Sequence, residues 1–215
     1  MKKTKIAWTE TTWNPITGCS KCSAGCQNCY AEKMARRLQA MGIEKYKNGF
    51  TVTLHENALD EPLSLKGQHT IFVCSMSDLF HKDVPFKFID RIMEVIEKTP
   101  QHTYQLLTKR AERMAEYFAK RAVPKNVMLG VTVDDWKGKE RIEYLKSIDN
   151  PLIKIVNQEN KGLAEARNTG IKNAEGFYIL PLDADDIIDK SYIEKACNIM
   201  ESISDVGIVY CKADY

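Results

Sequence analysis

The middle of the sequence alternates short apolar runs with amphipathic segments, and this alternation is what most limits the possible folds. Each apolar run reads as a buried strand, and each is followed by a segment with helical periodicity. The expected strands are Thr70–Ser75, Thr103–Leu107 and Val127–Val133, and the expected helices are Phe86–Lys98, Arg110–Lys120 and Lys137–Ser147. Such alternation favours βα units on a parallel sheet. Roughly four units fit before residue 148, which predicts a partial βα barrel of the α/β class.

Beyond this region the pattern restarts. Asp149, Asn150 and Pro151 have turn chemistry at the end of a charged helix, so we expect a domain boundary there, with domains at residues 1–148 and 149–215. The second stretch again alternates expected strands with expected helices. The strands are Leu152–Val156, Phe177–Leu182 and Gly207–Cys211, and the helices are Gly162–Asn173 and Lys190–Ser202.

The composition is that of an ordinary globular protein. The 215 residues are 44% hydrophobic and 28% charged, and the net charge of +2 is too small to indicate a nucleic-acid or membrane surface. No apolar run reaches the length of a membrane span, and the basic start lacks the apolar stretch of a signal peptide. We therefore expect a cytoplasmic protein without a membrane partner.

Four cysteines lie close together in the run GCSKCSAGCQNCYAE, at Cys19, Cys22, Cys26 and Cys29. Thiols this dense in a reducing compartment indicate a metal or iron–sulfur site. From Cys22 the spacing is C-x3-C-x2-C, which suits three corners of a [4Fe–4S] cluster and leaves one iron open. Zinc and unmetallated thiols are the alternatives, although four-cysteine zinc sites usually place a dozen or more residues between two pairs.

The segments NPITGC, GCQNCYAE, SMSDLFH, LLTKR and LGVTVD carry a resemblance over residues 5–147. They resemble a phage-associated family with a three-cysteine motif, which is similar to radical S-adenosylmethionine enzymes. In that family the cysteines correspond to Cys19, Cys26 and Cys29. In the wider radical enzymes they correspond to Cys22, Cys26 and Cys29. Both triads remain open.

This resemblance implies a [4Fe–4S] cluster that binds S-adenosylmethionine and releases a 5′-deoxyadenosyl radical. Asp78, Lys109, Arg110 and Asp134 come just after the expected strands, and we place them near the ligand. The alternative for each is a solvated charge in a loop. The phage association suggests nucleic acid or a modified nucleotide as the substrate.

An acidic turn, YILPLDADDIID, follows an apolar run near the other end of the chain. Carboxylates such as Asp183 and Asp185 can hold Mg²⁺ or Mn²⁺, which would bridge a nucleotide diphosphate. The alternative is an acidic turn that caps the next helix.

The longer stretch NKGLAEARNTGIKNAEGFYILPLDADDIID resembles the middle of a family-two glycosyltransferase with a GT-A fold, over residues 151–211. The resemblance implies that Asp183 and Asp185 form the metal and sugar-nucleotide motif, with Arg167 and Asn168 beside the nucleotide. It also implies a truncated, Rossmann-like βαβ fragment.

We therefore expect a chimeric chain that joins two truncated coding segments. The leading function is an iron–sulfur protein of the radical S-adenosylmethionine type. The runner-up is a glycosyltransferase that uses a nucleotide-sugar donor, and the third is a metal-binding protein without catalysis.

Overall fold

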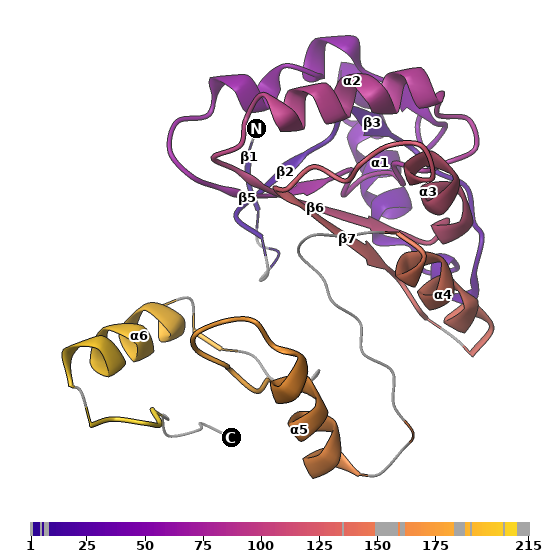
Figure 1. Cartoon of the computed structure of the whole chain (residues 1–215). Helices are drawn as coiled ribbons and strands as arrows, with labels where there is room; N and C mark the ends of the chain where they lie inside the picture. Colours follow the sequence, from indigo (N-terminus) through magenta and orange to yellow (C-terminus); the bar gives the residue numbers. More distant parts are fainter. Residues whose placement is uncertain are drawn as a thin grey trace. The chain divides into compact units, whose positions relative to one another are not determined.

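The computed structural model describes residues 2–4, 6, 9–134, 136–148, 159, 162–182, 188–189, 191–203 and 205–209 (Figure 1). The chain divides into two compact units, residues 1–155 and 156–215. Each unit is described by itself. The domain boundary predicted after residue 148 falls where the described residues stop, and it remains a prediction.

A five-stranded sheet forms the centre of the first unit, in the order β1-β2-β5-β6-β7. Its strands are β1 (Lys2–Lys3), β2 (Thr11–Trp13), β5 (Thr70–Val73), β6 (Thr103–Thr108) and β7 (Val127–Val131). Only β1 is antiparallel to its neighbour, and the four other strands pair in parallel. Parallel pairing places the carboxyl ends of β5, β6 and β7 at one edge of the sheet, where polar loops gather.

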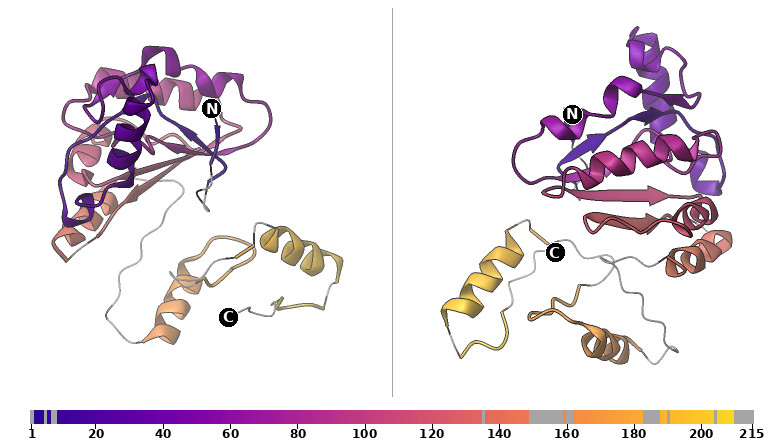
Figure 2. Two further views of the ribbon diagram at one scale, coloured as in Figure 1. Left: turned by 180° about the vertical axis from the view of Figure 1, so that it is seen from behind. Right: turned by 45° about the horizontal axis from the view of Figure 1, so that its top comes forward.

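Two helices cover this sheet, α2 (Phe86–Glu97) and α3 (Ala111–Phe118), and Figures 1 and 2 show α2 along one of its faces. In α2 the apolar positions repeat at helical spacing, so that a single stripe is buried. The stripe consists of Phe88, Ile89, Ile92, Met93, Val95 and Ile96. These side chains join Met114, Tyr117 and strand residues such as Ile71 in one core. Full burial of each large side chain contributes about 1.5–3 kcal/mol.

The remaining elements of the first unit are short, apart from α1. They are β3 (Ile16–Thr17), η1 (Ala24–Cys26), α1 (Tyr30–Ala40), η2 (Glu44–Tyr46), β4 (Thr53–Leu54), η3 (Glu56–Ala58), η4 (Glu61–Ser64), η5 (Trp136–Lys139) and α4 (Glu140–Lys146). β3 and β4 pair as a small antiparallel sheet. Between β3 and η1, Gly18 has a φ of 82°, and a Cβ there would collide with the Thr51 carbonyl, so this turn requires glycine.

The second unit contains two helices among its described residues, α5 (Leu163–Asn173) and α6 (Tyr192–Ser202). Both match the helices expected from the sequence. The strand expected at 177–182 is wrong, because these residues are not in a strand. A strand is defined by hydrogen bonds to a neighbouring strand, and apolar sequence alone does not supply that neighbour. The strand expected at 152–156 lies outside the described residues. Of the one expected at 207–211, residues 207–209 are not in a strand, and the last two lie outside the described residues.

A mixed α/β architecture with a parallel sheet is thus confirmed. The radical-enzyme barrel is not shown, since the described strands form an open sheet with β1 and β7 at its edges. Within the described residues, no helix is long and apolar enough to span a membrane.

Candidate functional site

Charged side chains converge where the parallel strands end. Asp78 lies in the loop after β5, Lys109 and Arg110 follow β6, and Asp134 follows β7. The segment from Cys19 to Cys29 folds back over the same edge, so residues about a hundred positions apart come into contact. The four residues that the sequence placed near a ligand are therefore brought together here, next to the cysteine segment.

Asp134 is the centre of one polar cluster. Its Oδ2 accepts hydrogen bonds from Ser23 Oγ at 2.5 Å and from the Gly25 amide at 2.9 Å, and it pairs with Lys109 Nζ at 2.5 Å. Its Oδ1 accepts from the Arg141 guanidinium at 3.1 Å. The hydrogen bond from Lys109, followed by that from Ser23, holds the pKa of Asp134 well below its usual value. This carboxylate therefore ties the cysteine segment to β6 and α4.

Asp78 is the centre of a second cluster and is buried. Its carboxylate accepts hydrogen bonds from Thr108 Oγ1 at 2.6 Å and from the amides of Phe80 and Lys109 at 3.0 and 3.1 Å. An ion pair with Arg110 at 3.0 Å completes the set. A buried carboxylate is tolerated because it is paired and fully hydrogen-bonded in this way.

Arg110 connects Asp78 to the start of the cysteine segment. Its guanidinium donates to the Ser20 carbonyl at 2.8 Å and approaches Cys19 Sγ at 3.5 Å. Ser20 Oγ is also hydrogen-bonded to Nε2 of His81 at 2.7 Å. Burial, followed by the charge of Arg110, lowers the pKa of the His81 imidazole. The segment is thus attached near its start, at Ser20 through Arg110, and in its middle, at Ser23 and Gly25 through Asp134.

The four clustered thiols do not form the predicted iron–sulfur site. Within the described part of the chain, no group of three or more His, Cys, Asp or Glu residues is arranged to hold a metal ion. Cys19 Sγ lies against Arg110, and Cys26 Sγ lies 3.5 Å from Ser23 Oγ. Burial raises the pKa of Cys19 to about 11, against the opposing charge of Arg110, so this thiol stays protonated at neutral pH. The described thiols therefore do not converge as a group of three.

Several members of the polar clusters were not predicted from the sequence. These members are Ser20, Ser23, Gly25, His81 and Arg141. The first four lie far along the sequence from their partners, whereas Arg141 is only 7 residues from Asp134. Serine and glycine in a loop carry no periodic signal. Arg141 lies on α4, where an arginine reads as a solvated helix charge.

The residues predicted to bind a nucleotide sugar belong to the second unit. Arg167 and Asn168 lie on α5, and both are exposed. Asp183 and Asp185 lie outside the described residues. The described residues of this unit also line an open apolar groove of about 550 Å³, with walls from α5, α6 and the segment 178–181.

Comparison with known proteins gives two family matches. A family model described as "Protein of unknown function (DUF5131)" matches residues 3–159. The chain belongs to this family. A second model, "Glycosyl transferase family 2", matches residues 131–214, so the two matches share residues 131–159. The DUF5131 match covers the parallel sheet and both polar clusters, and the glycosyltransferase match covers both helices of the second unit.

Curated relatives point in the same direction as the second match. An uncharacterized glycosyltransferase of Haemophilus influenzae is 34% identical over 80 residues, which is 37% of this chain and 27% of that protein. One of Rickettsia conorii is 26% identical over 155 residues, 69% of this chain and 26% of that protein. Glycosyltransferase GlyA of Streptococcus pneumoniae is 40% identical over 57 residues, 26% of this chain and 8% of that protein. No solved structure matches.

These findings correct the leading functional prediction. The iron–sulfur protein of radical S-adenosylmethionine type is wrong: a glycosyltransferase family model matches, the relatives described above are named as glycosyltransferases, and the described thiols form no metal site. The predicted [4Fe–4S] cluster and S-adenosylmethionine are wrong for the same reasons. The DUF5131 match does not show a link to radical enzymes. The runner-up, a glycosyltransferase, is the function that the comparisons support.

Proposed function

We propose that this DUF5131 protein takes part in glycosyl transfer from a nucleotide-sugar donor, and that the second unit binds the donor. The observation that carries this proposal is the family-two glycosyltransferase match over residues 131–214. Relatives named as glycosyltransferases support it. The chain spans about a quarter of the length of the first of these relatives, 27% and 26%, so the activity of a whole glycosyltransferase is part of the proposal.

The diphosphate of the donor requires positive charge, and the proposal assigns this to a divalent cation held by Asp183 and Asp185. Two carboxylates one residue apart are hard oxygen ligands that suit such a cation. A cation at this position offsets the charge on the diphosphate as it leaves the sugar. Both aspartates lie outside the described residues, so the assignment rests on their chemistry and on the family match.

Helix α5 supplies the second part of the proposed donor site. It begins directly after Gly162, whose φ is 88°, and it presents Arg167 and Asn168 at exposed positions in its second turn. A guanidinium can form two parallel hydrogen bonds with phosphate oxygens, and an amide both donates and accepts. We assign Arg167 to the diphosphate and Asn168 to the nucleoside.

Calorimetric titration tests this assignment. The whole chain is titrated with uridine diphosphate and with guanosine diphosphate in the presence of Mn²⁺. One of the two should bind, and the double variant Asp183→Asn, Asp185→Asn should weaken that binding at least tenfold, or about 1.4 kcal/mol. Asp60→Asn, an exposed carboxylate in the first unit, is the matched control and should bind like the parent chain.

Two results would overturn the proposal. The first is that neither nucleotide binds the whole chain with Mn²⁺ present. The second is that one binds equally well to the parent chain and to the double variant, which would place the nucleotide elsewhere.

A further inference from the structure

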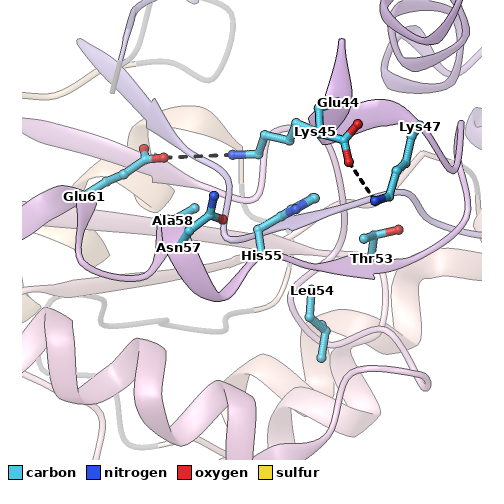
Figure 3. Close-up of a pocket in the computed structure, with 9 residues that line it drawn as sticks. All are labelled: Glu44, Lys45, Lys47, Thr53, Leu54, His55, Asn57, Ala58 and Glu61. Carbon is cyan, nitrogen blue, oxygen red and sulfur yellow. Dashed lines mark hydrogen bonds and ion pairs between the residues drawn. The ribbon is translucent and has the colours of Figure 1, made fainter. Parts of the chain in front are cut away.

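A polar cavity of about 400 Å³ lies in the first unit, between η2, β4, η3 and η4 (Figure 3). Two ion pairs contribute to its wall, Lys45 with Glu61 and Lys47 with Glu44. Figure 3 shows these pairs toward opposite ends of the cavity, with His55 between them. The cavity is separate from the polar clusters at the strand ends, because it shares no lining residue with them.

The pair of Lys45 and Glu61 is spaced to admit a third group. Its N–O distance is 4.0 Å, which is longer than a hydrogen bond, and each side chain is about one-third exposed. A bridging oxygen atom would lie about 2.8 Å from both partners. A hydroxyl at this point would accept from the Lys45 ammonium and donate to the Glu61 carboxylate, and only a group that both accepts and donates can do so.

Two further polar groups face the same space. His55 Nε2 lies 2.7 Å from Thr17 Oγ1, and its Nδ1 has no hydrogen-bond partner within the described part of the chain. The exposed amide of Asn57 likewise has no partner among the residues that the structure describes. An imidazole and an amide offer both donors and acceptors to a ligand.

The charges of the lining residues cancel. Lys45 and Lys47 balance Glu44 and Glu61. Burial, followed by the charge of Lys45, lowers the pKa of His55, so the imidazole is neutral at pH 7. A charged ligand would be attracted by one member of each ion pair and repelled by the other. A neutral ligand with many hydroxyls avoids this repulsion.

We propose that this cavity binds a neutral polyhydroxylated molecule, of the size of one or two sugar rings, through the Lys45–Glu61 pair, His55 and Asn57. This goes beyond the proposed donor site, because it concerns the first unit and does not depend on nucleotide binding.

Nuclear magnetic resonance titration of the whole chain, labelled with ¹⁵N, tests the proposal. The probes are methyl β-D-glucoside, methyl β-D-galactoside and methyl α-D-mannoside, with glycine as a zwitterion and inorganic phosphate as an anion. At least one glycoside should shift the amide signals of residues 54–58. Lys45→Met and Asn57→Ala should each weaken its binding about fivefold, the effect of one lost hydrogen bond.

Lys33→Met, at an exposed position on α1, removes the same charge away from the cavity and should leave binding unchanged. Asn57→Ala alters an exposed side chain, so it remains informative even if Lys45→Met fails to fold. The proposal is overturned if no glycoside shifts these signals, or if only glycine or phosphate does. It is also overturned if both cavity variants bind a glycoside as well as the parent chain.

Discussion

The two units contain similar alternations of apolar and polar sequence, yet they differ in what that sequence buries. In the first unit, side chains from β5, β6, α2 and α3 form one continuous core, with Ile92 and Met114 fully buried. In the second, none of the described residues is buried, and Phe177 is 92% exposed. Amphipathic helices gain their stability mainly from packing against another layer. Apolar periodicity therefore predicts a helix in both units, but it predicts a stable core only where a partner layer is present.

The largest expected effect comes from emptying the core of the first unit. Ile92→Ala should lower the free energy of unfolding by about 2–5 kcal/mol, because it leaves a cavity in close-packed surroundings. Ile193→Ala, at a half-exposed site on α6, should change it by less than about 0.5 kcal/mol. Tryptophan fluorescence during urea unfolding follows the first unit, which holds all three tryptophans, and far-ultraviolet circular dichroism follows the helices of both units. Equal losses of stability in the two variants would show that the second unit has a packed core as well.

A smaller effect is expected from substituting a glycine in the cysteine segment. A Cβ at Gly25 would collide with Oδ2 of Asp134, the atom that the Gly25 amide binds. Gly25→Ala should therefore cost about 1–3 kcal/mol, through loss of hydrogen bonds to this carboxylate. Gly170→Ala on α5 is the matched control, because a Cβ there meets no other atom. It should leave the tryptophan-monitored unfolding unchanged. A Gly25→Ala chain as stable as the parent would show that the Asp134 cluster does not hold this segment.

The Asp134 cluster also predicts a dependence of stability on pH. The folded-state pKa of Asp134 is lowered, first by the hydrogen bond from Lys109, so its contribution is fully present above the unfolded pKa of about 3.9. That contribution is lost as the pH falls from there. In Asp134→Asn, the stability deficit relative to the parent should be constant above about pH 5 and should shrink in more acidic solution. Urea unfolding at pH 7, 5 and 3 measures the deficit, with Asp60→Asn as the control. A deficit that grows toward pH 3 would contradict the assignment.

The smallest change concerns reactivity rather than stability. Burial acts to raise the pKa of Cys26, but hydrogen bonds from Cys22 and Ser23 and the charge of Lys109 lower it to about 7. Cys19 has a pKa of about 11. At pH 7.5, iodoacetamide should therefore alkylate Cys26 well before Cys19, because the thiolate is the nucleophile. Mass spectrometry of the digested chain gives the order. Alkylation of both thiols at equal rates would contradict the difference between their pKa values.

Part of this structure could be predicted from the sequence, because some elements carry their own apolar periodicity. The strands at β5, β6 and β7 and the helices α2 and α3 carry clear periodicity. β2 was missed, because three residues are too few for a periodic signal, and its partner β5 lies about 60 residues away. The strand expected at 177–182 was wrong for the opposite reason. Its apolar sequence is clear, but a strand also needs a partner.

The residues of the candidate site were likewise predictable from the sequence only in part. Asp78, Lys109, Arg110 and Asp134 could be placed together, because parallel strands end at one edge of the sheet. Their partners Ser23 and Gly25 could not, since a loop's return to that edge is set by tertiary contacts. The cysteine spacing predicted a metal cluster, but spacing does not fix the direction of each thiol. Cys19 Sγ instead accepts a hydrogen bond from the Arg110 guanidinium.

We propose that the nucleotide-sugar site belongs to the second unit and not to the charged edge of the parallel sheet. The most direct test is to titrate the ¹⁵N-labelled whole chain with uridine diphosphate or guanosine diphosphate in the presence of Mg²⁺, and to follow the assigned amide signals. We expect shifts at Arg167, Asn168 and residues 183–189, with the signals of Lys109 and Arg110 unchanged. Shifts confined to Lys109, Arg110 and the cysteine segment would contradict it and would place nucleotide recognition in the first unit.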